Sequence, residues 1–226
     1  MRISNVWLYD AGGGGRWLVD TGHRFERRAV LAALARLGLD PRGLAGVLLT
    51  HRHSDHAGNA AFLSTRFGLR VFAHRADVAI LRGEAPRPPM PRSGPSLAAL
   101  LNVFEERWPS ASLAALPLED GQHIAGLQTF WTPGHTEGSV LFWHAPSSSL
   151  LTGDTLLNAI PPTTLRAGLS LPHPAFTGDV ARAHESIVAF QRRGIAYQNL
   201  LCGHGRPLLG EARQKVEALL RKSNLL

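Results

Sequence analysis

A chain of 226 residues with 44% hydrophobic and 18% charged residues can bury a core, and its composition excludes a disordered or fibrous protein. A single cysteine excludes an intramolecular disulfide framework, and no stretch approaches the eighteen or so consecutive apolar residues of a membrane-spanning helix. The net charge of +7 would suit an anionic partner, but the arginines are scattered and form no block. Because the first eight residues lack the apolar core of a secretion signal, we expect a cytoplasmic protein with one domain over residues 1–226.

Short strands and helices alternate in the first third of the chain. Apolar residues at helical spacing, followed by Gly38, predict a helix over residues 27–37. The apolar run Ala45-Gly46-Val47-Leu48-Leu49 predicts a buried strand. The other elements expected here are strands at 6–9, 16–20 and 70–73 and a helix at 59–67.

Five prolines between residues 82 and 95 argue against regular structure, so we expect a long loop that is either a lid or disordered. Beyond it we expect a helix at 97–107, strands at 122–124, 127–131, 139–143 and 150–152, a helix at 180–193, a strand at 199–202 and a helix at 210–222. These strands favour two sheets with helices outside both over a single doubly wound sheet. No glycine-rich phosphate-binding pattern supports nucleotide binding.

The most informative segment follows the strand predicted at 45–49. It reads Thr50-His51-Arg52-His53-Ser54-Asp55-His56 and holds three imidazoles and one carboxylate in six consecutive positions. Imidazole and carboxylate groups bind zinc and similar divalent metals. Side chains alternate on extended backbone, so His51 and His53 can point the same way. A solvated, His-rich turn is the alternative interpretation, and the remainder of the chain argues against it.

Three further segments repeat the pattern of a strand, a tight glycine and a ligand-type side chain. Each follows a predicted strand, and the glycines let the chain approach a shared centre closely. They are Thr132-Pro133-Gly134-His135-Thr136, Thr152-Gly153-Asp154-Thr155 and Cys202-Gly203-His204-Gly205. One such segment would be weak evidence, because a lone histidine after a strand is usually structural. Four segments in this order indicate one shared metal site.

In these motifs the chain resembles the metallo-β-lactamase-fold hydrolase superfamily, and its glyoxalase II-like branch in particular. The resemblance runs from Leu18-Val19-Asp20-Thr21-Gly22 to Gly203-His204-Gly205. It implies an α/β fold of the four-layer αββα sandwich type, with two divalent metal ions at one edge. The implied ligands are His51, His53 and His135 for the first metal, Asp55, His56 and His204 for the second, and Asp154 as the bridge between them. Asp20 would orient metal ligands from behind, and the alternative for Asp20 is a helix-cap or turn aspartate.

The chemistry that the resemblance implies is hydrolysis by metal-bound hydroxide. Two cations about 3.5–4 Å apart lower the pKa of a water between them, which then attacks a polarised carbonyl or phosphoryl centre. Asp55 or Asp154 could accept the proton in that step, and the motifs leave the choice open. Zinc is the metal expected first, although nitrogen and oxygen ligands also suit iron, manganese or cobalt.

Departures from better-known members of the family narrow the expected substrate. Zinc β-lactamases place a metal-binding cysteine where this chain has Asp154, and acyl-homoserine lactonases carry a tyrosine where it has Thr155-Leu156-Leu157. Glyoxalase II adds a helical domain with a glutathione pocket, for which this chain offers about one helix beyond His204. Persulfide dioxygenases of this fold use a single iron, and seven intact ligands favour the dinuclear hydrolase over them. We expect substrate contacts from residues 82–95 and 158–173.

The main hypothesis is a dinuclear metal-dependent hydrolase that cleaves a small ester, thioester or lactone. Its expected partner is a small molecule, with neither membrane nor nucleic acid involved, and the sequence leaves the oligomeric state open. The alternative is a phosphodiesterase or nuclease of the same fold, for which the chain lacks clustered basic and aromatic residues. A metal-stabilised binding protein is a third hypothesis. It is disfavoured because a structural zinc fills four positions without a bridged pair.

Three residues near the motifs have simpler interpretations. Cys202 lies within an apolar strand and is expected to be a buried structural thiol, although a thiolate can bind zinc. Tyr197 precedes the same strand and is expected to pack in the core. His74 follows the strand predicted at 70–73, and support of the metal site and a surface position are equally compatible with the sequence.

Overall fold

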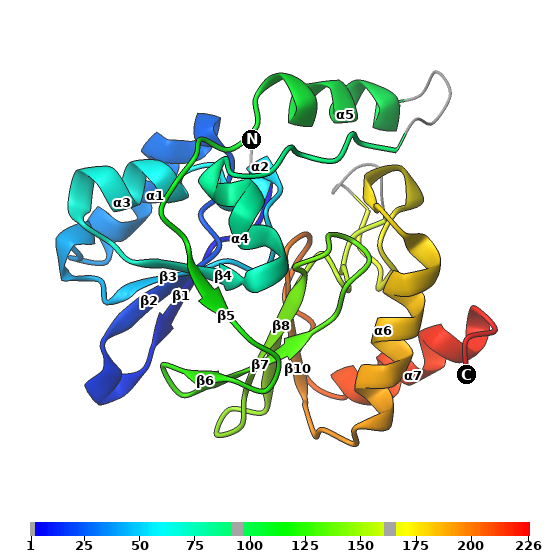
Figure 1. The fold of residues 1–226 in the computed structure, drawn as a ribbon. Coiled ribbons are helices and arrows are strands. Elements are labelled where there is room, and N and C mark those ends of the chain that lie inside the picture. The colour runs from blue at the N-terminus through cyan, green and yellow to red at the C-terminus, as the bar shows by residue number, and fades with distance from the viewer. Residues whose placement is uncertain (1–2, 92–96, 161–165) are drawn as a thin grey trace.

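Two five-stranded sheets form the centre of the computed structural model, which describes residues 3–91, 97–160 and 166–226 (Figure 1). The first sheet has the order β1-β2-β3-β4-β5, and the second has the order β10-β9-β8-β7-β6. The first comprises β1 (Trp7–Asp10), β2 (Arg16–Val19), β3 (Gly46–Leu48), β4 (Val71–His74) and β5 (Leu116–Leu118). The second comprises β6 (His123–Ile124), β7 (Leu127–Trp131), β8 (Val140–His144), β9 (Ser149–Gly153) and β10 (Asn199–Cys202). Neighbours from β2 to β5 run parallel, as do β9 and β10, and the other pairs are antiparallel.

Helices cover the outer face of each sheet. α1 (Arg27–Arg36), α3 (Ala60–Phe67) and α4 (Arg75–Arg82) pack on the first sheet, and α6 (Val180–Arg192) and α7 (Ala212–Lys222) pack on the second. Successive side chains of a strand point to opposite faces of its sheet, so neighbouring residues pack in different layers. Val47 of β3 packs against the helical layer, whereas Leu48 packs between the sheets in the same cluster as Phe142 of β8. The four-layer αββα sandwich expected from the sequence is confirmed.

Two regular elements on the first sheet were not predicted, and each has a physical reason. α4 begins after His74, whose Nδ1 accepts a hydrogen bond from the backbone N–H of Ala76, in place of the Ser, Thr, Asp or Asn that usually caps a helix. β5 contains Pro117, which is tolerated because the strand lies at the sheet edge. The last helix, α7, begins at Ala212, two residues later than expected.

The prolines of residues 83–91 precede α5 (Leu97–Arg107), which lies across the end of the sandwich (Figure 1). The Asn102 amide donates to the carbonyls of Pro91 (3.0 Å) and Ala175 (2.6 Å), and Glu105 Oε2 accepts from the N–H of Ser54 at 2.8 Å. These bonds tie α5 to both halves of the protein. Residues 92–96 and 161–165 lie outside the described residues. They include the last part of the loop expected at 82–95 and part of the segment 158–173 from which substrate contacts are expected. No helix in the described ranges is long and apolar enough to cross a membrane.

Candidate metal centre

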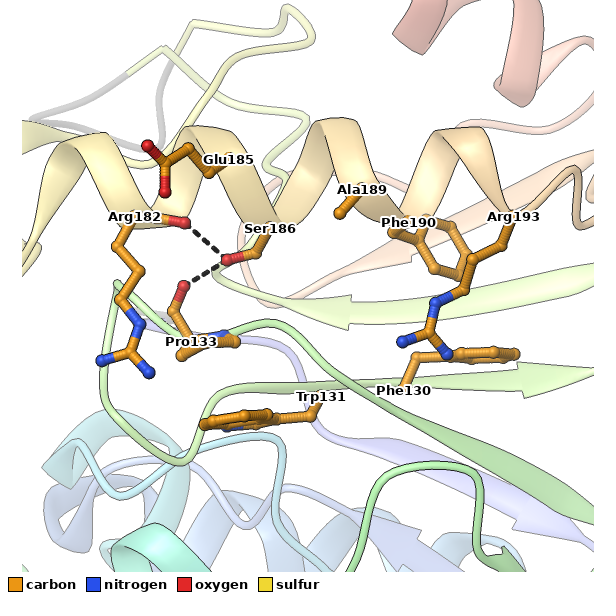
Figure 2. Close-up of a pocket in the computed structure, with 9 residues that line it drawn as sticks. All are labelled: Phe130, Trp131, Pro133, Arg182, Glu185, Ser186, Ala189, Phe190 and Arg193. Atoms are coloured by element: carbon orange, nitrogen blue, oxygen red, sulfur yellow. Dashed lines mark hydrogen bonds between the residues drawn. The ribbon is translucent and has the colours of Figure 1, made fainter.

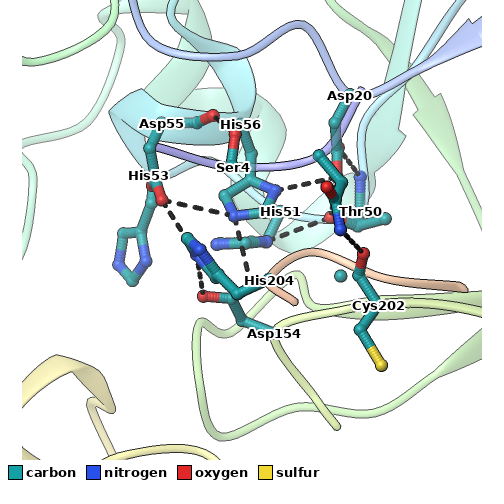
Figure 3. A network of polar contacts seen from close by, with 12 residues as sticks. Ser4, Asp20, Thr50, His51, His53, Asp55, His56, Asp154, Cys202 and His204 are labelled. Carbon is teal, nitrogen blue, oxygen red and sulfur yellow. Dashed lines mark hydrogen bonds and ion pairs between the residues drawn. The ribbon is translucent and has the colours of Figure 1, made fainter. Parts of the chain in front are cut away.

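Five strand ends meet at one edge of the sandwich, and each is followed by side chains singled out from the sequence. Figure 3 labels those that follow β2, β3, β9 and β10. Asp20 follows β2 directly, and the segment 51–56 follows β3 and runs into the short helix α2 (Ser54–Ala57). The other three loops follow β7, β9 and β10 of the second sheet. The structure brings the seven predicted ligands together in two groups. The first group is His51, His53 and His135, and the second group is Asp55, His56, Asp154 and His204.

The first group consists of three buried imidazoles. His53 Nδ1 lies 3.0 Å from His135 Nε2, and the ring of His51 lies 4.7 Å from that of His135, centroid to centroid. Burial and the neighbouring imidazoles hold the pKa of His51 and of His53 well below the usual range, and burial lowers the pKa of His135 to about 4. All three rings are therefore neutral near pH 7 and have lone pairs available to a cation.

The second group combines two imidazoles with two carboxylates. Asp154 Oδ1 lies 3.2 Å from His56 Nε2, and Asp154 Oδ2 lies 3.3 Å from His204 Nε2. Asp55 Oδ2 is 3.1 Å from the same atom of His204. Burial opposes ionisation of Asp55 and Asp154, but the imidazoles beside them keep the pKa of each carboxyl well below its usual range. Asp154 Oδ2 is also 3.7 Å from His135 Nε2, so this carboxylate lies between the two groups.

Asp20 controls the orientation of two imidazoles. Its Oδ2 accepts hydrogen bonds from His56 Nδ1 and from the Thr50 hydroxyl, both at 2.8 Å. Because that hydroxyl donates to Asp20, it accepts from His51 Nδ1, which lies 3.1 Å away. Both rings then carry a proton on Nδ1 and point Nε2 toward the centre. Burial opposes the charge on His56, but Asp55, Asp154 and Asp20 raise its pKa well above the usual range, so a cation bound at its Nε2 would displace a second proton. The backbone φ of Asp20 is 62°, which is typical of a tight turn. Asp20 is therefore a turn aspartate, and its side chain also contacts the predicted ligands.

The donor atoms fit divalent cations. Buried polar atoms normally have hydrogen-bond partners, but His51 Nε2 has none among the described residues. Within each group, one ligand atom per residue lies within 4.8 Å of all the others. Three neutral imidazoles, and a mixed set of imidazoles and carboxylates, are donor sets that zinc, iron and manganese accept.

Two glycines allow the loops to approach this closely. A Cβ on Gly203 would lie 2.3 Å from Asp154 Oδ1, and a Cβ on Gly153 would lie 2.4 Å from Thr50 Oγ1. Any side chain at either position would push apart loops that carry the donor atoms. The close approach expected of these glycines from the sequence is present in the structure.

Several supporting residues gave no signal in the sequence. Thr177 Oγ1 lies 3.2 Å from His135 Nδ1, and its hydroxyl donates to the carbonyl of His173 at 2.9 Å. The hydroxyl oxygen therefore accepts a hydrogen bond from the Nδ1–H of His135. The Ser4 hydroxyl donates to the carbonyl of Asp55, and the Asn5 amide donates to the carbonyls of Cys202 (2.9 Å) and Gly205 (2.7 Å). These residues lie in irregular segments without a motif, and only the folded chain brings them to the site.

A groove of about 270 Å³ lies between β7 and α6 (Figure 2). Trp131 of β7 lines it on one side, and Arg182 of α6 and Arg193, which directly follows α6, line it on the other. Both guanidinium groups have partners, Glu137 at 2.7 Å and Asp120 at 3.0 Å. None of the seven predicted ligands lines this groove, so it is separate from the candidate metal centre.

Tyr197, His74 and Cys202, which lie near the motifs in the sequence, are all buried. Tyr197 is 1% exposed and accepts a hydrogen bond from the Gln191 amide, which confirms the packing role. His74 is neither a surface residue nor a contact of the seven side chains: it caps α4 and stacks on Trp131, with ring centroids 5.0 Å apart. Cys202 is completely buried, as expected of a structural thiol.

The thiol of Cys202 is expected to be unreactive in the folded protein. Burial raises its pKa to about 12, so almost no thiolate exists at pH 8, and the thiolate is the reactive form. Incubation with a disulfide reagent should label no thiol under native conditions and one per chain in denaturant. Rapid native labelling would show that β10 opens readily.

Most of the chain is similar to known proteins. Residues 1–204 match the model of the metallo-beta-lactamase superfamily, and the chain belongs to that superfamily. It is 34% identical over 161 residues to the "Probable metallo-hydrolase YybB" of Bacillus subtilis (strain 168), covering 70% of this chain and 65% of that protein. It is 35% identical over 147 residues to a "Hydroxyacylglutathione hydrolase" of Anaeromyxobacter dehalogenans (strain 2CP-C), covering 65% of this chain and 44% of that protein.

The solved structure of TTHA1623 in a di-iron-bound form shares the fold. It superposes with a TM-score of 0.66 and 24% sequence identity over 92% of this chain and 93% of that one. At this identity the likeness establishes the fold alone. The chain is thus a member of the metallo-beta-lactamase superfamily, and the relatives described above carry the names metallo-hydrolase and hydroxyacylglutathione hydrolase.

Proposed function

We propose that the protein is a dinuclear hydrolase of small carbonyl esters, with thioesters, esters and lactones as its substrate class. The observation that carries this proposal is the convergence of seven side chains in two adjacent groups with Asp154 between them. Relatives called hydroxyacylglutathione hydrolase, whose named substrate is a thioester, support the carbonyl class. The chain spans about two-thirds of YybB and less than half of the hydroxyacylglutathione hydrolase described above, so its own substrate is part of the proposal.

The proposed ligands are His51, His53 and His135 for one cation and Asp55, His56 and His204 for the other, with Asp154 shared. Two divalent cations, zinc first and iron or manganese as alternatives, would supply an activated water and polarise the substrate carbonyl.

Within this site we assign proton transfer to the carboxylate of Asp55. Its side chain is 23% exposed, compared with 11% for Asp154, so the Asp55 side chain is the more accessible to substrate and solvent. The pKa of Asp55 lies well below its usual range: burial opposes ionisation, but His56 and His204 favour it more strongly. The carboxylate is therefore ionised near neutral pH and can accept a proton. Asp154, held by three imidazoles, is assigned the positioning role between the cations.

A substrate panel tests the proposal. Protein reconstituted with zinc, iron or manganese should hydrolyse at least one small thioester, ester or lactone, and elemental analysis should give two bound ions per chain. The control is the same preparation after removal of the ions by a chelator. Hydrolysis of phosphodiesters alone would favour the phosphodiesterase alternative, and equal hydrolysis without bound ions would refute the proposal.

A further inference from the structure

A buried carboxylate on α4, outside the metal-binding motifs, contacts the loops of the first histidine group. The side chain of Asp77 is completely buried, which is rare for a charged residue unless it is paired. Its Oδ2 accepts hydrogen bonds from the backbone N–H of Arg52 (3.1 Å) and the hydroxyl of Thr136 (2.8 Å). Its Oδ1 accepts from the N–H of Gly138 (3.1 Å) and lies 3.5 Å from Arg52 Nε. Every group that faces the two carboxylate oxygens in these contacts is a donor.

These contacts link two loops that are distant in the sequence. Arg52 separates His51 from His53, and Thr136 follows His135 directly. A Cβ added to Gly138 would lie 2.4 Å from Asp77 Cγ, so the carboxyl group fills the space between the loops. The distance between the loops therefore depends on Asp77.

We propose that Asp77 is the positioning residue of the first metal group, a role that rests on the proposed function. It holds the backbone of both loops at the separation at which the three imidazoles of His51, His53 and His135 bind one cation. Asp20 differs, because its bonds reach His56 directly and His51 through Thr50. Among the described contacts, Asp20 thus supports one imidazole of each group, whereas Asp77 contacts the loops of the first group alone.

Replacement by asparagine separates this role from simple space filling. Asn has nearly the same shape, but its amide offers one acceptor oxygen and one donor nitrogen. In either orientation of the amide, its NH2 group faces a backbone N–H, that of Arg52 or that of Gly138. One buried N–H then loses its partner, and the loop that contains it must move.

A zinc titration of the metal-free protein against a chromophoric chelator tests the proposal. The wild-type protein should bind two equivalents in two steps, and the step weakened by His53→Ala belongs to the first group. Asp77→Asn should weaken this same step by about 10- to 100-fold, the usual effect of losing a partner that orients metal ligands, and leave the other step unchanged. Thr136→Val removes one donor of the set without leaving a backbone group unpaired, and should weaken the same step by a smaller factor.

Leu220→Ala is the control for a general loss of stability. Leu220 is completely buried under the second sheet, in α7, and the hydrophobic cluster in which it packs contains no residue of the loops at 50–56 and 132–138. It should lower the melting temperature and leave both zinc steps unchanged. If it weakens the first step as much as Asp77→Asn does, or if Asp77→Asn retains both steps, the positioning role is overturned. Should Asp77→Asn fail to fold, an unchanged first step in Thr136→Val overturns it instead. Failure of the wild type to bind two equivalents would contradict the proposed function and not this inference alone.

Discussion

Asp154→Ala is expected to reduce kcat/KM by about two to three orders of magnitude, the scale at which losing one electrostatic group of an active site slows catalysis. Its carboxylate lies within 3.7 Å of imidazole nitrogens of His56, His135 and His204, which belong to both groups. Without it, the proposed cations would lose their shared ligand, and the second group would lose one of its two negative charges. Elemental analysis of the purified variant should give fewer than two bound ions per chain.

Asp40→Ala is the matched control for this variant. Asp40 is also an aspartate, but its side chain is 60% exposed, and it pairs with Arg42 on the surface. Exposed pairs of this kind contribute little to stability, so the control should keep its bound ions and its rate. A rate within tenfold of the wild type for Asp154→Ala, with its circular dichroism spectrum unchanged, would remove Asp154 from the catalytic centre.

The sequence predicts the central residues of the site because they follow strands that can be recognised locally. The buried run at 45–49 places residues 51–56 at a strand end, and tight glycines mark the other loops in the same way. The carboxyl ends of parallel strands lie at the same edge of a sheet, and within each sheet the strands that carry these loops run in the same direction. The convergence of the seven side chains therefore follows from local patterns and the family resemblance together.

The supporting residues could not be predicted because their contacts depend on packing between distant segments. Asp77 lies 59 residues from Thr136, and Thr177 lies 42 residues from His135. Asp77 belongs to α4, a helix that itself gave no conventional N-cap signal because His74 caps it. Its amino-acid type is common on exposed helix faces, so only the structure shows that it is buried between two loops.

Removing the bound ions is expected to lower the melting temperature by about 8–16 °C for each site that was occupied. A ligand present at about a thousand times its Kd stabilises the folded state by about 4 kcal/mol. In a protein of this size, 1 kcal/mol changes the melting temperature by about 2–4 °C. Calorimetric scans before and after chelation, with elemental analysis of both samples, measure the difference.

Restoring zinc should restore the melting temperature, whereas magnesium should not, because magnesium prefers oxygen ligands and the first group offers nitrogen alone. His53→Ala is the matched variant, since it removes one imidazole of the first group and leaves the second group complete. The rise in melting temperature that zinc causes in this variant should be about half that in the wild type. An unchanged melting temperature after verified loss of the ions would show that the two groups do not bind metal in the folded state.

The difference in melting temperature between the metal-loaded and the metal-free protein should grow as the pH rises from about 6.5 to about 10. Burial opposes the charge on His204, but Asp154 and Asp55 favour it more strongly and raise its pKa to about 10. A histidine whose pKa is higher in the folded state than its unfolded value, about 6.5, stabilises that state fully below the unfolded value. It loses this contribution as the pH rises through the folded value. In the metal-free protein, His204 and His56, whose pKa the carboxylates also raise well above its usual range, offset the two carboxylates at pH 6, and the contribution of His204 is lost as the pH rises through about 10. Melting scans of both forms across this interval should diverge, and parallel curves would place the proton elsewhere in the cluster.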